Sequence, residues 1–218
     1  MKQYIDIKNW KRREHFEVFN SFDEPLFGVV VRVECSAARE VAKKKGYPFS
    51  LYYLYLSLKA INETEEFRYR IEEDKVVCYD SVGAGATIFR DDETYGCGYF
   101  PYNEDIEAFM QQAKTETERV KAEFGLKFPD PGPEVIHYST VPWVDFYAVN
   151  HARKFSASRS IPKITFGKIT RDGEKMWLPV DIHANHALLD GYHVGKFVDR
   201  FQELLNGLDK VFCNIYKL

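Results

Sequence analysis

The stretch NHALLDGYH, residues 185–193, joins a β-branched segment to a helix-like one and decides how the rest of the sequence is interpreted. The preceding segment WLPVDIHA (177–184) alternates as a strand does, with successive side chains on opposite faces. One face carries Val180, Ile182, Ala184 and His186, and the other carries Asp181, His183 and Asn185. The pattern therefore predicts that His186 lies on the apolar face, at the exit of a strand.

Two interpretations of His186 follow from this position. A buried imidazole favours its uncharged form, which keeps one ring nitrogen free to accept a proton, as a general base requires. A single histidine on an apolar face is also commonly a core residue with satisfied hydrogen bonds, and Asp190 can be a simple helix N-cap. The segment alone leaves both interpretations open.

Composition limits the remaining possibilities. The chain has 218 residues, of which 45% are hydrophobic and 16% aromatic, enough for a substantial core, and we expect a single domain over 1–218. The net charge of −3 gives no electrostatic footprint for nucleic acid. The sequence contains no apolar run long enough for a membrane span. The first residues, MKQYIDIKNWKRREHF, lack the apolar core of a secretory signal. We expect a cytoplasmic protein.

The cysteines are Cys35, Cys78, Cys97 and Cys213. None forms a C-x-x-C pair and their spacing fits no zinc template, so no metal site is expected. We expect reduced, mostly buried thiols, as is usual for a cytoplasmic chain. Cys97, flanked by glycines, is the one candidate for a reactive thiol.

Periodicity predicts alternating strands and helices. The expected strands are 27–35, 68–72, 75–80, 86–90, 96–102, 143–149, 163–170 and 175–184. The expected helices are a partly helical 8–19, a short helix capped by Ser36 and stopped by Gly46, a buried helix over 50–62, a helix over 104–125 with Phe124 on its apolar line, and a last helix from Gly191 to Gly207. This order indicates an α/β two-layer fold, a mixed β-sheet with helices on one face.

Several motifs together resemble one family. KNWKRREHF (8–16), VPWVDF (141–146), IPKITFGK (161–168) and HALLDGYHVGKF (186–197) are similar, in order and spacing, to the chloramphenicol acetyltransferase family. The resemblance implies the CoA-dependent acyltransferase fold. It also implies a homotrimer with active sites between subunits.

The resemblance implies roles for catalytic residues. His186 would be the general base, taking a proton from a substrate hydroxyl as its oxygen attacks the thioester of acetyl-CoA, with no acyl-enzyme. Ser139 would hydrogen-bond the oxyanion. Thr165 would hold a water near that intermediate and contribute to the coenzyme side, although it can equally be an ordinary strand residue. Asp190 would pair with Arg12 to fix the loop of His186, although Arg12 can also be a solvated charge.

The substrate side departs from the family. The residues expected at the acceptor are Phe19, Phe27, Tyr95, His137 and His151, with Asn185 in place of a second histidine before His186. The polar ones change the hydrogen bonds available to an acceptor. Lys168 is expected near the nucleotide phosphates, or else is a solvated lysine at a strand edge. Pro48 and Ser50 occupy positions where coenzyme contacts would be expected.

These motifs predict an acetyl-CoA-dependent O-acetyltransferase for chloramphenicol or a related small molecule, with a role in antibiotic resistance. Acetyl-CoA would be a co-substrate, with no permanently bound cofactor, and no nucleic acid or membrane partner is expected. The alternatives are an acyltransferase for another alcohol or thiol, and a trimeric binding protein without catalysis.

Overall fold

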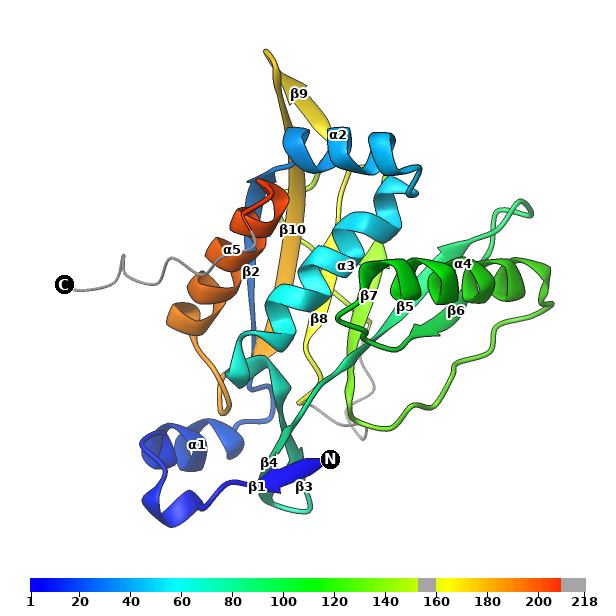
Figure 1. The fold of residues 1–218 in the computed structure, drawn as a ribbon. Helices are drawn as coiled ribbons and strands as arrows, with labels where there is room; N and C mark the ends of the chain where they lie inside the picture. The colour runs from blue at the N-terminus through cyan, green and yellow to red at the C-terminus, as the bar shows by residue number, and fades with distance from the viewer. Residues whose placement is uncertain (153–159, 209–218) are drawn as a thin grey trace.

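The computed structural model describes residues 1–152 and 160–208 (Figure 1). Its strands are β1 (Lys2–Tyr4), β2 (Leu26–Glu34), β3 (Tyr69–Glu72), β4 (Lys75–Tyr79), β5 (Gly83–Phe89), β6 (Tyr95–Phe100), β7 (Val135–Thr140), β8 (Lys163–Phe166), β9 (Thr170–Asp172) and β10 (Lys175–Asn185). Its α-helices are α1 (Arg13–Asn20), α2 (Ser36–Lys45), α3 (Phe49–Asn62), α4 (Ile106–Ala122) and α5 (Gly191–Leu205), with 3-10 turns η1 (Ile7–Asn9) and η2 (Glu65–Arg68).

The main sheet is mixed, as the sequence predicts. Its strands run in the order β2-β10-β8-β7-β5-β6, and β9 pairs with the end of β10. Strand β7 is parallel to both β5 and β8, and the other pairs are antiparallel. The long strand β10 pairs with β2 over nine residues, from Trp177 opposite Glu34 to Asn185 opposite Leu26. The strand that leads to His186 is therefore an internal one, held from both sides.

Helices α2, α3, α4 and α5 lie on one face of this sheet (Figure 1). Helix α3 is apolar nearly all round because it packs beneath α5, α2 and α4 as well as against the sheet, and Leu58, Ala60 and Ile61 are fully buried. Helix α5 buries Val194, Phe197, Phe201, Leu204 and Leu205. It ends where predicted, because Gly207 takes the left-handed conformation at φ 79°. We call the opposite side of the main sheet the outer face.

A smaller unit lies beside the main sheet. Strands β1, β4 and β3 form a separate antiparallel sheet, and α1 lies next to it (Figure 1). Phe16 of α1 packs with Tyr69, Val76, Ala187 and Leu188 in a second apolar cluster. This cluster joins the N-terminal segment to the turn that follows β10, so α1 reaches the predicted catalytic loop.

The strand predicted over 143–149 is wrong. The segment leaves the sheet in a turn in which the Val144 N–H donates to the Val141 carbonyl. Its apolar alternation does not create a buried face, since Trp143 and Tyr147 are 60% and 80% exposed. Only Phe146 is buried, and its ring occupies the space that a Cβ on Gly167 would need.

Other predictions need smaller corrections. The strand expected over 163–170 is divided, because β8 ends at Phe166 and β9 begins only at Thr170, although the Gly167 N–H still donates to the Pro179 carbonyl of β10 at 2.9 Å. Helix α4 stops at Ala122, so Phe124 is 92% exposed rather than part of an apolar line. Ser36 is the first residue of α2 rather than its cap, and its hydroxyl accepts from the Met176 N–H.

Candidate active site

His186 lies in a tight turn between β10 and α5. Its backbone N–H donates to the Pro25 carbonyl at 2.8 Å, next to the start of β2. The buried Asn185 accepts from the Ala187 N–H through Oδ1 at 2.8 Å, and its carbonyl accepts from the Leu189 N–H at 3.1 Å. Asn185, expected to alter the acceptor site, therefore holds the turn that carries His186.

The His186 ring lies between two phenylalanines. It stacks on Phe19 of α1 with ring centroids 4.1 Å apart and planes 3° apart, and it meets Phe27 of β2 at 4.7 Å. Within the part of the chain that the structure describes, its Nδ1 is buried without a hydrogen-bond partner. The phenyl rings offer this nitrogen no hydrogen-bond partner. His186 is half-buried at the end of the strand rather than sealed in the core.

Arg12 and Asp190 form the pair that the resemblance implies. Arg12 Nη1 lies 2.6 Å from Asp190 Oδ2, and its Nη2 lies 3.4 Å from the His186 carbonyl oxygen. Arg12 is buried, with its side chain 7% exposed. Burial alone would raise the pKa of Asp190, but the Arg12 hydrogen bond and nearby positive charge hold it below its usual range. The pair thus connects α1 to the loop that carries His186.

Asp190 is also the N-cap of α5. Its Oδ1 accepts from the Tyr192 N–H at 3.0 Å, and its own N–H donates to His193 Nδ1 at 3.1 Å. His193 is buried in the first turn, with Nε2 3.4 Å from Glu66 Oε1. Burial lowers the pKa of His193 in spite of the nearby carboxylates of Glu66 and Asp190. Both interpretations of Asp190, N-cap and ion-pair partner, are therefore present together.

Ser139 and Thr165 lie on the outer face, in one row across the sheet. Ser139 of β7 is opposite Thr165 of β8, which is opposite Asp181 of β10. The next row carries His137, Lys163 and His183. Desolvation by the neighbouring strands and the charge of Lys163 lower the pKa of His137, although the residue is exposed at the surface of a cavity.

His186 and Ser139 do not meet within one chain. Ser139 is two strands away from Asp181, and His186 follows Asp181 by five positions along β10. With strands about 4.8 Å apart and a rise of about 3.3 Å per residue, their backbones are roughly 15–20 Å apart. The predicted base and the predicted oxyanion donor thus belong to two separate regions of the chain.

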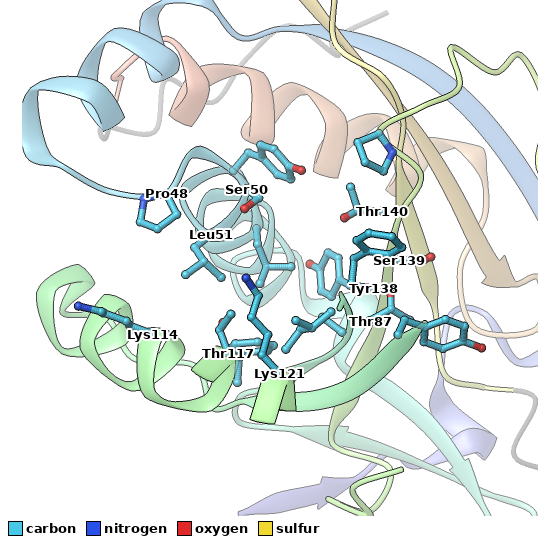
Figure 2. Close-up of a pocket in the computed structure, with 18 of the residues that line it drawn as sticks. Pro48, Ser50, Leu51, Thr87, Lys114, Thr117, Lys121, Tyr138, Ser139 and Thr140 are labelled. Atoms are coloured by element: carbon cyan, nitrogen blue, oxygen red, sulfur yellow. The ribbon is translucent and has the colours of Figure 1, made fainter. Parts of the chain in front are cut away.

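Two cavities meet at Ser139. The large cavity, about 830 Å³, lies between α3, α4 and the sheet, with Pro48, Ser50, Lys114 and Lys121 among its lining residues (Figure 2). The small cavity, about 340 Å³, is lined by Tyr95, Cys97, Phe128, His137 and His151. The two cavities share Ala86, Thr87, Tyr95, Tyr138 and Ser139.

The predicted acceptor residues fall into two groups. Phe19 and Phe27 surround His186, whereas Tyr95, His137 and His151 line the small cavity beside Ser139. The structure therefore does not bring all five together in one chain. Each group lies beside one of the two predicted catalytic side chains.

The positions expected to contact the coenzyme divide into two groups: Pro48 and Ser50 line the large cavity, whereas Lys168 and Thr165 do not. Lys168 is exposed at the bend after β8 and lines neither of the two cavities, and Thr165 is buried with its hydroxyl 3.4 Å from His151 Nε2. The lysines at the large cavity are Lys114 and Lys121 (Figure 2). Their spacing of seven residues, two helical turns, places them on one face of α4 and could have revealed them. Trp143, also lining this cavity, lies in the motif VPWVDF.

The thiols are not activated. Cys35 is buried and unpaired, and burial raises its pKa to about 12. Cys78 and Cys97 are half-buried free thiols whose pKa values are raised by burial as well. A raised pKa leaves little thiolate, which argues against Cys97 as a reactive group. Cys213 lies outside the described residues.

Within residues 1–152 and 160–208, no helix is long and apolar enough for a membrane span.

Comparison with known proteins identifies the class. The fold is that of the CoA-dependent acyltransferases. A solved chloramphenicol acetyltransferase superposes with a TM-score of 0.85 at 30% identity, covering 94% of this chain and 100% of that one. A solved Azotobacter vinelandii dihydrolipoamide acetyltransferase superposes with a TM-score of 0.62 at 14% identity, covering 88% and 86%, which shows a shared fold alone.

Sequence comparison identifies the family. The family model for chloramphenicol acetyltransferase matches residues 2–202. Chloramphenicol acetyltransferase 3 of Escherichia coli is 32% identical over 204 residues, covering 93% of this chain and 96% of that protein. The chloramphenicol acetyltransferase of Proteus mirabilis is 31% identical, covering 91% and 92%. The chain belongs to the chloramphenicol acetyltransferase family and is an acyltransferase of that family, whose members use acetyl-CoA as co-substrate.

Proposed function

We propose that this protein transfers an acetyl group from acetyl-CoA directly to a hydroxyl group of chloramphenicol or a related small molecule. The observation that carries the proposal is the position of Ser139, where the large and small cavities meet. A thioester in the large cavity and an alcohol in the small cavity would both reach this serine. The small cavity would then be the acceptor site and the large cavity the coenzyme site.

The chemistry needs one base and one oxyanion donor. His186 accepts the proton of the acceptor hydroxyl while the hydroxyl oxygen attacks the thioester carbonyl carbon. The Ser139 hydroxyl donates a hydrogen bond to the resulting oxyanion. The tetrahedral intermediate then collapses, the carbon–sulfur bond breaks, and the proton on His186 passes to the leaving thiolate. No acyl-enzyme is needed, which fits a base whose ring contacts phenylalanines rather than a serine or cysteine nucleophile.

A second copy of the chain would complete each site. His186 and Ser139 are roughly 15–20 Å apart within one chain. In a homotrimer with sites between subunits, His186, Phe19 and Phe27 of one copy would face Ser139, His137 and His151 of the next. This arrangement would unite the two groups of predicted acceptor residues. A single domain over 1–218, a cytoplasmic location and a role in resistance stay predictions.

Release of the CoA thiol, measured with and without chloramphenicol, tests the chemistry. We expect chloramphenicol-dependent thiol release with formation of the O-acetyl product. Absence of product with chloramphenicol, together with release in the presence of another alcohol or a thiol, would assign a different acceptor. The polar residues His137 and His151 favour this second candidate, because a cavity that hydrogen-bonds its ligand rejects analogues without the partner group. A protein that binds chloramphenicol without any thiol release would be a binding protein.

Subunit mixing tests the shared site. His186→Ala and Ser139→Ala variants are each expected to be nearly inactive, because each removes one half of every site. In randomly mixed trimers, one of three interfaces in each mixed trimer would carry both native residues, which restores about a quarter of the wild-type activity. Recovery no greater than the sum of the separate variants would show that the two residues do not act across an interface.

A further inference from the structure

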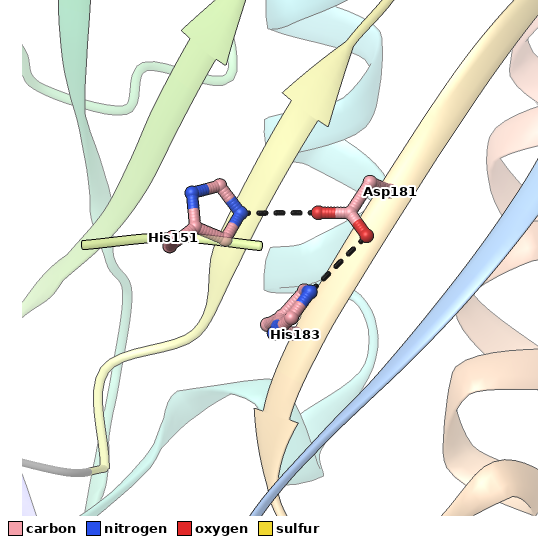
Figure 3. Close-up of side chains that lie close together, drawn as sticks. All are labelled: His151, Asp181 and His183. Atoms are coloured by element: carbon pink, nitrogen blue, oxygen red, sulfur yellow. Dashed lines mark hydrogen bonds and ion pairs between the residues drawn. The ribbon is translucent and has the colours of Figure 1, made fainter. Parts of the chain in front are cut away.

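Three side chains on the outer face converge outside the residues assigned to catalysis. His151, Asp181 and His183 place their imidazole nitrogens and carboxylate oxygens within 4.8 Å of one another (Figure 3). Among residues 1–152 and 160–208, this is the only group of three or more such side chains close enough to hold a metal ion. Asp181 and His183 come from β10, whereas His151 comes from the segment that follows β7.

The interatomic distances suit coordination. His151 Nε2 lies 3.1 Å from Asp181 Oδ2, and His183 Nε2 lies 3.2 Å from Asp181 Oδ1. Zinc holds imidazole nitrogen and carboxylate oxygen at about 2.0–2.2 Å, so two ligands of one tetrahedral or octahedral ion are about 2.9–3.5 Å apart. Each imidazole therefore lies at such a separation from one oxygen of Asp181, and the ligand atoms of all three side chains lie within 4.8 Å of one another.

The surroundings hold the group in place. The Asp181 side chain is 2% exposed and the side chains of His183 and His151 are 10% and 15% exposed. The His183 ring lies over Gly28, its partner on β2, where an added Cβ would come within 2.7 Å of Nε2. Any larger residue at Gly28 would displace the ring. Gly28 thus leaves room for the His183 ring in the orientation that directs Nε2 toward Asp181.

Further oxygen atoms lie beside the same nitrogens. The Val149 carbonyl oxygen is 3.2 Å from His183 Nε2, and the Thr165 hydroxyl is 3.4 Å from His151 Nε2. A cation bound by the three side chains could complete its coordination with such an oxygen or with water. Two imidazoles and one carboxylate suit zinc and the neighbouring first-row metals, whereas magnesium and calcium prefer oxygen ligands alone.

We propose that His151, Asp181 and His183 form a binding site for one divalent first-row cation of the zinc type. The ion would connect β10 to the segment that carries Trp143 and His151, and so fix one wall of the small cavity. Each imidazole would bind through Nε2 and carry its proton on Nδ1. The spacing of cysteines and histidines did not predict this site, because His151 meets β10 only through the path of the chain after β7.

Cobalt titration tests the site, because bound Co²⁺ absorbs in the visible range. Full-length protein freed of metal with a chelator is titrated with Co²⁺, and zinc is then added in competition. We expect one equivalent per chain, displaced by zinc, without the sulfur-to-cobalt charge-transfer band that a cysteine ligand gives. His151→Gln is expected to weaken binding by about 100-fold or more, since loss of a direct ligand exceeds the usual cost of losing its outer partners.

Two more variants separate binding at this site from effects on folding. Asp181→Asn keeps the shape of the side chain but removes the charge, and should bind as weakly as His151→Gln. His15→Gln alters an exposed histidine of α1 and should bind like the wild type. Circular dichroism checks that each variant is folded. Because His151 is more exposed than Asp181, replacement of His151 should disturb the fold less than replacement of Asp181. Wild-type binding no tighter than that of His151→Gln, or equal loss in His15→Gln, would overturn the proposal.

Discussion

The imidazole of His186 lies flat on the ring of Phe19, with centroids 4.1 Å apart and planes 3° apart. The two residues are far apart in sequence, and α1 brings Phe19 to the end of β10. The contact covers one face of the proposed base. It also gives α1 a direct part in the orientation of the ring.

Replacement of Phe19 should slow catalysis without abolishing it. Phe19→Ala removes the stacking, which contributes about 1 kcal/mol for a pair of this kind, so kcat should fall roughly fivefold. Phe19→Tyr keeps the stacked ring and should stay within about twofold of wild type. Phe22→Ala is the matched control, because Phe22 contacts Phe19 at 5.3 Å and is half exposed. Equal kcat in Phe19→Ala and wild type would contradict a role for the stacking.

Removal of the Ser139 hydroxyl should affect the transition state. Ser139→Ala is expected to lower kcat by about 10²–10³, with little change in KM, since the hydroxyl is needed only when the oxyanion forms. Steady-state rates of thiol release check this. Ser50→Ala, at the other side of the large cavity, is the comparison and should mainly affect the KM for acetyl-CoA. A raised KM with unchanged kcat in Ser139→Ala would show a binding role instead.

Asp190 should make the fold sensitive to acid. Its pKa is lowered in the folded chain from 3.8, so its contribution to stability is present above about pH 4 and is lost as the pH falls through the folded-state value. Asp190→Asn should lower the free energy of unfolding at pH 7 by roughly 1–3 kcal/mol, because Arg12 keeps a buried charge without its partner. The difference from wild type should shrink toward pH 3.

Urea unfolding at a series of pH values measures this effect. Asp172→Asn, which changes an exposed carboxylate of β9, should leave the stability within about 0.5 kcal/mol of wild type. A loss in Asp190→Asn that is the same at every pH would rule out the ion pair as its cause.

The lysines of α4 should favour the phosphates of the coenzyme. Lys114→Ala and Lys121→Ala should each raise the KM for acetyl-CoA about fivefold at low ionic strength, with kcat unchanged, since each removes about 1 kcal/mol of screened charge interaction. Added salt should reduce both effects. Lys127→Ala, whose lysine pairs with Glu123 outside the large cavity, is the control. A larger effect of Lys168→Ala would favour the expectation from sequence.

Local patterns predicted the elements well where one pattern decides the structure. The apolar surface of α3, the apolar line and glycine stop of α5, and the alternation before His186 led to correct elements. The segment 143–149 alternates in the same way, yet it forms no strand, and its side chains contact neighbouring segments of the same chain: Phe146 packs on Gly167, and Asp145 pairs with Arg32 of β2 at 2.6 Å. Alternation alone does not say whether a neighbouring strand is available.

The site was predicted through resemblance more than through periodicity. The Arg12–Asp190 contact joins residues 178 positions apart, a distance that no local pattern reports. The row of Ser139, Thr165 and Asp181 depends on the register of three strands. The alternating faces of β10 were right, but the face with Asp181 and His183 is buried, because the chain after β7 folds back over it.

The N-terminal segment has a practical consequence for handling this protein. Strand β1 pairs with β4 from Lys2 onward, and the segment that follows supplies both Arg12 and Phe19 to the turn at His186. A purification tag or a truncation at this end would therefore disturb the segment that holds the turn at His186, the proposed base, through Arg12 and Phe19. A fusion protein could then fold correctly and still turn over slowly. The low rate would be misread as evidence that the tested acceptor is not the substrate.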